Sequence, residues 1–325
     1  MQQVKRLFVT GNQNFSQILL GLVLLITVIV LSLASPFFLT WDNWRNILDQ
    51  SALQVIIAIG MTFVICTGGI DLSVGSISAL SGVCMAVAMH AGVSVELAIL
   101  LGITAGALVG MSNGWLISQL NLNPFIVTLG TMSVVRGAAL IITTGIPIYG
   151  FPKAFTWWGN GHIGPLNPPM LIAVFIALLG ALVLNKTKLG YYTLALGGNE
   201  EALRRSGVAH KVYKLMVYTI CGITAALGGL VVTARLNTAE PLAGWMFELD
   251  AIAAVVLGGT DMKGGRGSIT GTIMACLLLG MLRNGLTILN IPSYYQQLAI
   301  GIIILVAIIV SELRLRNAPG HQKNS

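Results

Sequence analysis

The sequence predicts an all-α polytopic membrane protein of about ten transmembrane helices, some of them short or broken, with the N and C termini cytoplasmic. Hydrophobic residues make up 55% of the 325 residues and charged residues only 9%, whereas soluble domains carry about 25% charge. The apolar residues also fall into runs of roughly 20, the length that crosses a bilayer as a helix. Basic residues gather in a few short segments between these runs, as topology signals do.

Polar breaks divide the chain into ten expected crossings within one transmembrane domain, residues 1–325. Lys5 and Arg6 precede the first apolar run, which is long enough to span, so we expect a retained helix rather than a cleaved signal peptide. The eighth run is short, and the sequence leaves open whether it crosses fully or forms a broken or partly re-entrant helix. The expected spans are residues 16–35, 51–68, 74–90, 95–118, 124–145, 169–185, 213–234, 249–262, 268–289 and 294–311.

The distribution of charge orients these spans. Six crossings from a cytoplasmic start return the loop of residues 186–213 to the cytoplasm. Residues 186–214 hold six basic residues, the N-terminus two and the tail three, so eleven of the 18 lie on one side, in agreement with the positive-inside rule. Tryptophans at 41, 44, 157 and 158 fall at the opposite boundary, where aromatic belts form. The net charge of +7 therefore reflects topology, and we expect no nucleic-acid partner.

One charged segment interrupts this apolar chain near its middle, "LGGNEEALRRSGV" from Leu196 to Val208. Asparagine favours the N-cap position of a helix, and glutamates in a first turn suit the helix dipole. Arginines at the other end and a following glycine suit a helix C-terminus. The segment is therefore a short helix, and it either forms a surface turn that sets topology or docks onto a cytoplasmic partner. Its residues are Asn199, Glu200, Glu201, Ala202, Arg204, Arg205, Ser206 and Gly207.

Six motifs, in order along the chain, resemble those of bacterial ATP-binding-cassette sugar importer permeases of the ribose type. The resemblance runs in the family's order from about residue 37 to residue 297, which is most of the chain. They are "GGIDLSVGS" (68–76), "LGGNEEALRRSGV" (196–208), "ARLNTAEPLAG" (234–244), "ELDAIAAVVLGGT" (248–260), "GGRGSITGT" (264–272) and "NGLTILNIPSYYQ" (284–296).

The resemblance implies a transport subunit of the bacterial inner membrane that has no ATPase of its own, and the sequence indeed contains no phosphate-binding loop. It implies cytoplasmic ATPase subunits that carry ATP and Mg²⁺, a periplasmic sugar-binding protein, and a second permease copy or close paralogue. It also implies that residues 186–213 form a cytoplasmic coupling loop, with Glu201, Ala202 and Gly207 at the family's E-A-A…G positions. The segment "EEALRR" is more polar than that pattern, which leaves its side-chain contacts open.

Polar residues inside or beside the spans are candidates for a translocation path or gate. Asp71 lies near the end of the second span, next to Gly69, and either caps the following helix or takes part in gating. Arg136 lies within a span, where an arginine faces a partner or a wet cavity, and Asp71 is one candidate partner. The remaining candidates could equally be helix caps, interhelical hydrogen bonds or interface anchors. They are Asn123, Phe125, Asn284, Tyr295 and Gln296.

Two other classes of membrane protein fit the sequence less well. An ion-coupled secondary sugar carrier needs coupling carboxylates near the bilayer midplane, and Asp71 is the main acidic residue so placed. An intramembrane metalloenzyme needs a metal-binding catalytic motif, and H-E-x-x-H does not occur. The four cysteines form no C-x-x-C pair, so we expect no metal. The sugar itself stays open among ribose, another pentose, a hexose and the sugar-like autoinducer.

Overall fold

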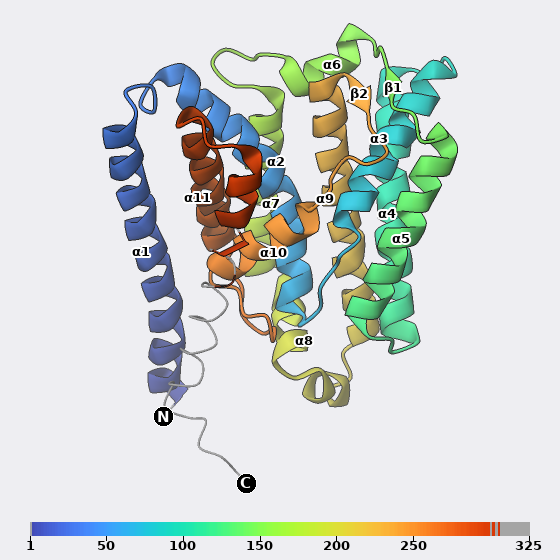
Figure 1. Ribbon diagram of the computed structural model, residues 1–325. Coiled ribbons are helices and arrows are strands. Elements are labelled where there is room, and N and C mark those ends of the chain that lie inside the picture. Colours follow the sequence, from blue (N-terminus) through green and yellow to red (C-terminus); the bar gives the residue numbers. More distant parts are fainter. Residues whose placement is uncertain (1, 300, 303–304, 306–325) are drawn as a thin grey trace.

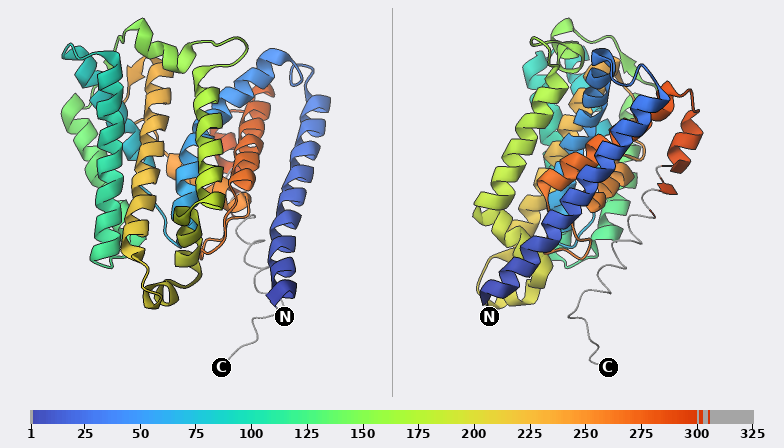
Figure 2. Two further views of the ribbon diagram at one scale, coloured as in Figure 1. Left: turned by 180° about the vertical axis from the view of Figure 1, so that it is seen from behind. Right: turned by 90° about the vertical axis from the view of Figure 1, so that its left-hand side faces the viewer.

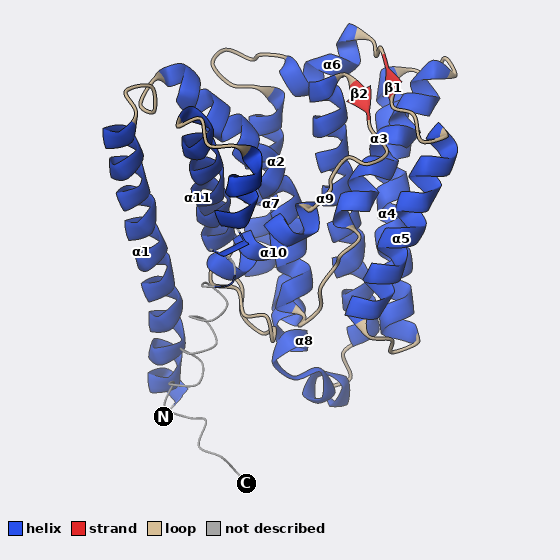
Figure 3. Cartoon of the chain, viewed as in Figure 1, coloured by secondary structure: helices blue, strands red, loops and turns tan. Residues whose placement is uncertain are grey.

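The computed structural model describes residues 2–299, 301–302 and 305, with side chains from residue 17 onward. Helices account for nearly all of its secondary structure (Figure 3). They are α1 (Gln2–Ala34), α2 (Trp41–Cys66), α3 (Val74–His90), α4 (Val95–Gln119), α5 (Pro124–Thr143), α6 (Lys153–Asn160), α7 (Pro168–Lys186), α8 (Lys188–Arg205), α9 (His210–Leu236), α10 (Phe247–Leu257) and α11 (Ile269–Ile288). Two short strands, β1 (Ile148–Tyr149) and β2 (Thr238–Ala239), pair antiparallel.

The core lies around α2 and α9, which are surrounded by the other long helices (Figure 1). Apolar burial gives little drive for helix association inside a bilayer, so close backbone contact takes its place. A methyl group on Gly110 of α4 would lie 2.3 Å from the Tyr218 carbonyl oxygen, and one on Gly222 of α9 would lie 2.2 Å from the Gly106 carbonyl oxygen. Small residues therefore let α4 and α9 meet backbone to backbone.

Seven helices of the described residues are long and apolar enough to cross a membrane: α1 over its part Gln17–Ala34, α2, α4, α5, α7, α9 and α11. The all-α polytopic prediction is thus confirmed, but a set of ten full spans is not found. Helix α3 has 17 residues. Helix α10 has 11, which at 1.5 Å per residue is about 16 Å, half of a hydrocarbon core. The expected eighth span, 249–262, is therefore a half-length helix.

Other span boundaries also need correction. Helix α2 begins at Trp41, ten residues before the expected start of the second span at 51. Helix α6 and the β1–β2 pair lie in the loops between spans, where the sequence predicted no structure. Residues 293–299 are helical, and half of the expected tenth span, 294–311, lies outside the described residues.

Both ends of the bundle are well defined in the figures. Helix α1 begins, α2 ends and α8 lies at one end, whereas α6, β1 and β2 lie at the other (Figure 1). Six elements, α1 to α5 and α7, separate the start of the chain from α8, as the expected topology requires. Helix α1 leans across the edge of the bundle against α11 (Figure 2), and the Gln17 amide donates to the Ser268 hydroxyl at 2.7 Å.

Candidate functional site

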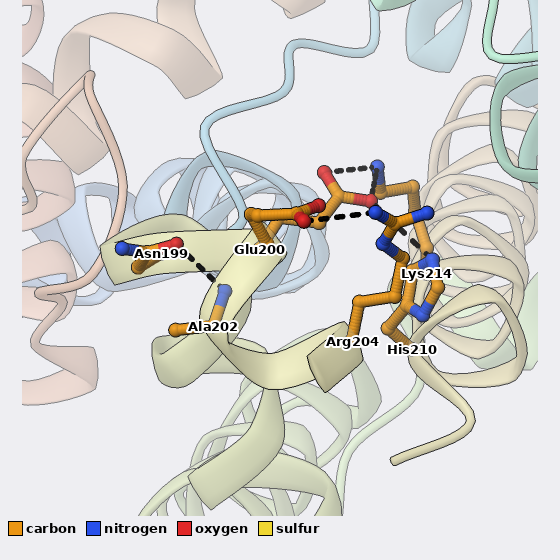
Figure 4. A network of polar contacts seen from close by, with 7 residues as sticks. Asn199, Glu200, Ala202, Arg204, His210 and Lys214 are labelled. Atoms are coloured by element: carbon orange, nitrogen blue, oxygen red, sulfur yellow. Dashed lines mark hydrogen bonds and ion pairs between the residues drawn. The ribbon is translucent and has the colours of Figure 1, made fainter. Parts of the chain in front are cut away.

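The charged segment forms a separate short helix at the end of α8. Asn199 interrupts α8 with extended backbone angles of φ −164° and ψ 93°. Its side-chain oxygen accepts a hydrogen bond from the Ala202 amide at 2.8 Å (Figure 4), which is N-cap geometry. Gly207, at φ +76°, follows the last turn, where a left-handed residue ends a helix. The predicted cap and stop are both confirmed, and we call residues 200–205 the charged helix.

Ion pairs order the charged helix and tie it to α9. The Glu201 carboxylate accepts from Arg204 at 2.8 Å and from Arg205 at 2.9 Å. Hydrogen bonds from these two arginines lower the pKa of the Glu201 carboxyl, which is fully exposed. The Lys214 ammonium of α9 donates to the two carboxylate oxygens of Glu200 at 2.7 and 2.8 Å (Figure 4). Glu200 thus anchors the helix, while Glu201 and the arginines face water.

A polar groove of about 470 Å³ runs beside the charged helix at this end of the bundle. Charged residues of α8 and α9 form one wall, and the turn between α4 and α5 forms the other. The lining residues are Ile117, Asn121, Leu122, Pro124, Glu200, Glu201, Arg204, His210 and Lys214. The site therefore combines an exposed charged helix with a groove into which another chain could reach.

Arg136 is the second notable polar group, half-way along α5. Its guanidinium donates to the carbonyl of Pro241 at 2.8 Å and to that of Ala243 at 2.6 Å. The carboxylate of Glu248, on the first turn of α10, lies near enough to attract it electrostatically. In the part of the chain that the structure describes, the expected pairing with Asp71 is wrong, because the loop before α10 takes this role.

Asp71 is completely buried in the extended segment that joins α2 to α3. One carboxylate oxygen accepts from the amide of Ser73 at 2.9 Å and from its hydroxyl at 2.5 Å. The Asn113 amide of α4 donates to the same Ser73 hydroxyl at 2.9 Å. Because Ser73 itself occupies the N-cap position of α3, Asp71 orders the turn before the helix and does not cap it. A side chain at neighbouring Gly69 would meet the Tyr218 hydroxyl at 2.3 Å.

Known proteins match this chain over most of its length. The family model described as "branched-chain amino acid transport system / permease component" matches residues 43–308. The ribose import permease protein RbsC of Bacillus subtilis is 45% identical over 289 residues, which cover 88% of this chain and 90% of that protein. The chain belongs to this family of permeases.

Two further relatives place the permease within the ribose-type group. The D-allose transport system permease protein AlsC of Escherichia coli is 39% identical over 290 residues, 89% of each chain. The galactose/methyl galactoside import permease protein MglC of the same species is 34% identical over 311 residues, 90% of this chain and 93% of that protein. The permease is thus a transport subunit rather than an enzyme, and a multi-pass protein of the inner membrane.

The other residues expected on a translocation path are dispersed in the permease. Asn123 caps α5 by accepting from the Phe125 amide at 2.9 Å, and Phe125 is exposed in the first turn. Asn284 of α11 donates to Asn43 of α2 at 2.8 Å, an interhelical hydrogen bond. The remaining two lie after α11. Gln296 donates to the Ile291 carbonyl at 2.9 Å, and Tyr295 is exposed.

Sequence reasoning assigned no role to two acidic residues of α10. Glu248 faces the crossing of α3 with the loop before α10, since a methyl on Gly75 would lie 2.6 Å from its carboxylate. Asp250 binds Arg283 of α11 through both oxygens, at 2.6 and 2.7 Å. The sequence did contain a sign of such a role, because "ELD" opens an apolar run. Ionisable residues within the membrane usually line a transport pathway or pair with another charged group.

Proposed function

We propose that the permease imports a monosaccharide, which a periplasmic binding protein delivers and cytoplasmic ATPase subunits drive through the membrane. The observation that most supports this proposal is the charged helix. It is separately capped at Asn199, anchored through Glu200 to Lys214, and exposed through Glu201 at the end of the bundle. A surface turn that only sets topology needs positive charge but no such independent, tethered helix beside a groove.

In this proposal the ATPase grips the charged helix, which lies within the coupling loop 186–213. Residues Asn199, Glu200, Glu201, Ala202, Arg204, Arg205, Ser206 and Gly207 make or shape the contact. Leu203, which is buried, holds the helix on the bundle so that a push on its charged face moves the permease. ATP and Mg²⁺ bind to the partner, and the end of the bundle that holds α8 and the start of α1 faces the cytoplasm. The prediction that the C-terminus is also cytoplasmic falls on residues outside the described part of the chain.

We further propose that the sugar passes beside the two short helices. Helix α3 and α10 begin next to each other, since a methyl on Gly244 would lie 2.5 Å from the Gly75 carbonyl oxygen. Broken helices that meet inside a membrane are common at transporter substrate sites. Arg136 and Glu248 flank this crossing, and Gly69 and Asp71 form the turn that allows α3 to move.

A second permease copy or close paralogue would close this path. The loop before α10 carries Trp245 and Leu242, which are 74% and 51% exposed beside the charged Arg136. An apolar surface next to a half-buried charge is suited to a partner subunit, and a two-fold axis naturally encloses a pathway. The sugars named for the relatives are ribose, allose and galactose, so a pentose or hexose is the proposed substrate.

The decisive test is ATP-dependent uptake into proteoliposomes that hold the permease, its ATPase and its binding protein, with labelled ribose, allose and galactose. Wild type should accumulate one sugar. Glu201→Lys and Gly207→Asp should lose both uptake and ATPase binding, whereas Lys188→Glu, a charge reversal elsewhere on α8, should keep them. Normal transport by the two charged-helix variants would reduce that helix to a topology signal. Uptake driven by an ion gradient without ATP would identify a secondary carrier instead.

A further inference from the structure

Three backbone segments meet where the charged helix joins the rest of α8. A methyl group on Gly197 would lie 2.1 Å from the Cys66 carbonyl oxygen, 2.3 Å from the Gly265 amide nitrogen and 2.7 Å from the Gly264 α-carbon. Cys66 ends α2, and the two glycines belong to the loop between α10 and α11. All three segments lie at the α8 end of the bundle (Figure 1). We call this contact the glycine joint.

Backbone atoms make the nearest contacts in the glycine joint. The Gly265 amide donates to the Cys66 carbonyl at 2.9 Å. Gly264, Gly265 and Gly68 have φ values of +84°, +80° and +78°, a backbone conformation that residues with a side chain rarely adopt. A methyl on Gly264 would lie 2.6 Å from the Gly68 amide nitrogen. Because the nearest neighbours of Gly197 and Gly264 are backbone atoms, these contacts cannot absorb a displacement by changing rotamers.

The joint connects the charged helix to both broken helices. Beyond Cys66, the chain runs through the turn of Asp71 into α3, and the loop of Gly264 leads back to α10 and on to α11. We infer that Gly197 is a positioning residue for transport. When the ATPase moves the charged helix, the backbone contacts of Gly197 displace the C-terminal ends of α2 and α10. This displacement then reaches the path between α3 and α10. This inference rests on the proposed function and adds the route by which the ATPase acts.

The chain contains a matched control for this idea. Gly198 follows Gly197 in the same helix, yet a methyl on Gly198 would have nothing within 4 Å. Gly197→Ala and Gly198→Ala make the same chemical change and bring a similar gain in helix propensity. They differ in whether the new methyl enters the joint, so a difference between them measures the contact rather than composition.

The experiment compares both variants with wild type in proteoliposomes that contain the complete transporter. We expect Gly197→Ala to retain ATPase binding by pull-down and basal ATP hydrolysis, but to transport at least tenfold less sugar per ATP hydrolysed. Gly198→Ala should stay within twofold of wild type. A variant that only misfolded would lose ATPase binding and hydrolysis together with uptake, so the ratio of sugar to ATP separates transmission from structure.

Cys66 provides a second, independent readout. Its thiol is buried under the 258–268 loop, since a methyl on Gly267 would lie 2.1 Å from the sulfur. In a background with Cys84, Cys221 and Cys276 replaced by alanine, we compare the rate at which a membrane-permeant maleimide labels Cys66. Gly197→Ala should be labelled at least fivefold faster than wild type or Gly198→Ala, because the added methyl group separates the backbone segments of the joint.

Each outcome decides the matter. The inference is overturned if Gly197→Ala couples ATP to uptake as wild type does, if Gly198→Ala is equally uncoupled, or if Gly197→Ala simply loses the ATPase. Unchanged labelling of Cys66 in Gly197→Ala would refute the idea that the added methyl group separates the segments of the glycine joint. A wild-type complex without ATP-driven uptake would refute the proposed function itself and this inference with it. If both the wild type and Gly197→Ala couple ATP hydrolysis to sugar uptake, only the inference about Gly197 is refuted and the proposed function stands.

Discussion

The cap of the charged helix makes a quantitative prediction. Asn199→Ala removes the side-chain oxygen that accepts from the Ala202 amide at 2.8 Å. That amide, in the first turn of the helix, then has only water to bond. Loss of an asparagine N-cap costs about 1 kcal/mol. A helix of this length is marginal without external support, and it is held mainly by the Glu200–Lys214 pair and by buried Leu203. A change of about 1 kcal/mol therefore alters its folded population by up to about fivefold.

If the ATPase recognises the helix only when it is folded, its dissociation constant should rise by the same factor. The assay is titration of purified ATPase onto the permease in nanodiscs. Asn199→Asp is the matched control, because aspartate caps as well as asparagine and its charge suits the helix N-terminus. We expect Asn199→Ala to bind about fivefold more weakly and Asn199→Asp to bind at least as tightly as wild type. Equal binding by all three would refute the reasoning, and equal weakening by both variants would show that the amide group, not the cap, matters.

Three further results are expected. Arg136→Met leaves two carbonyls of the loop before α10 unpaired, so thermal unfolding in detergent should show a loss of about 2 kcal/mol, and Arg136→Lys should lose less. A double-mutant cycle on Asn43 and Asn284 should give a coupling energy of about 0.6 kcal/mol, and strict additivity would contradict the interhelical bond. The lowered pKa of Glu201 means that its stabilisation is complete above the ordinary value of about 4.3 and is lost as the pH falls through the lowered value. Hydrogen exchange of residues 200–207 should therefore be faster in Glu201→Gln than in wild type at pH 7, with the difference vanishing in acid; a constant difference would refute the ion pairs.

Local patterns explain what the sequence predicted well. The cap at Asn199 and the stop at Gly207 depend on residues a few positions apart, and the apolar runs are themselves continuous. Such features depend on helix geometry and on the solvent, and both are legible in the order of residues. The eighth span was harder, because residues 249–262 are apolar enough for a helix but only the bundle shows that α10 stops after 11 residues.

By itself, the sequence determined that lipid solvates this protein, where most of its helices lie, and that a charged helix forms at residues 200–205. Only the tertiary structure decided which distant segments meet. It paired Arg136 with carbonyls 105 and 107 residues away and placed Gly197 against Cys66, while Gly198 beside it stayed open. The sequence does not distinguish these two adjacent glycines, and only the backbone that folding brings against Gly197 makes their surroundings different.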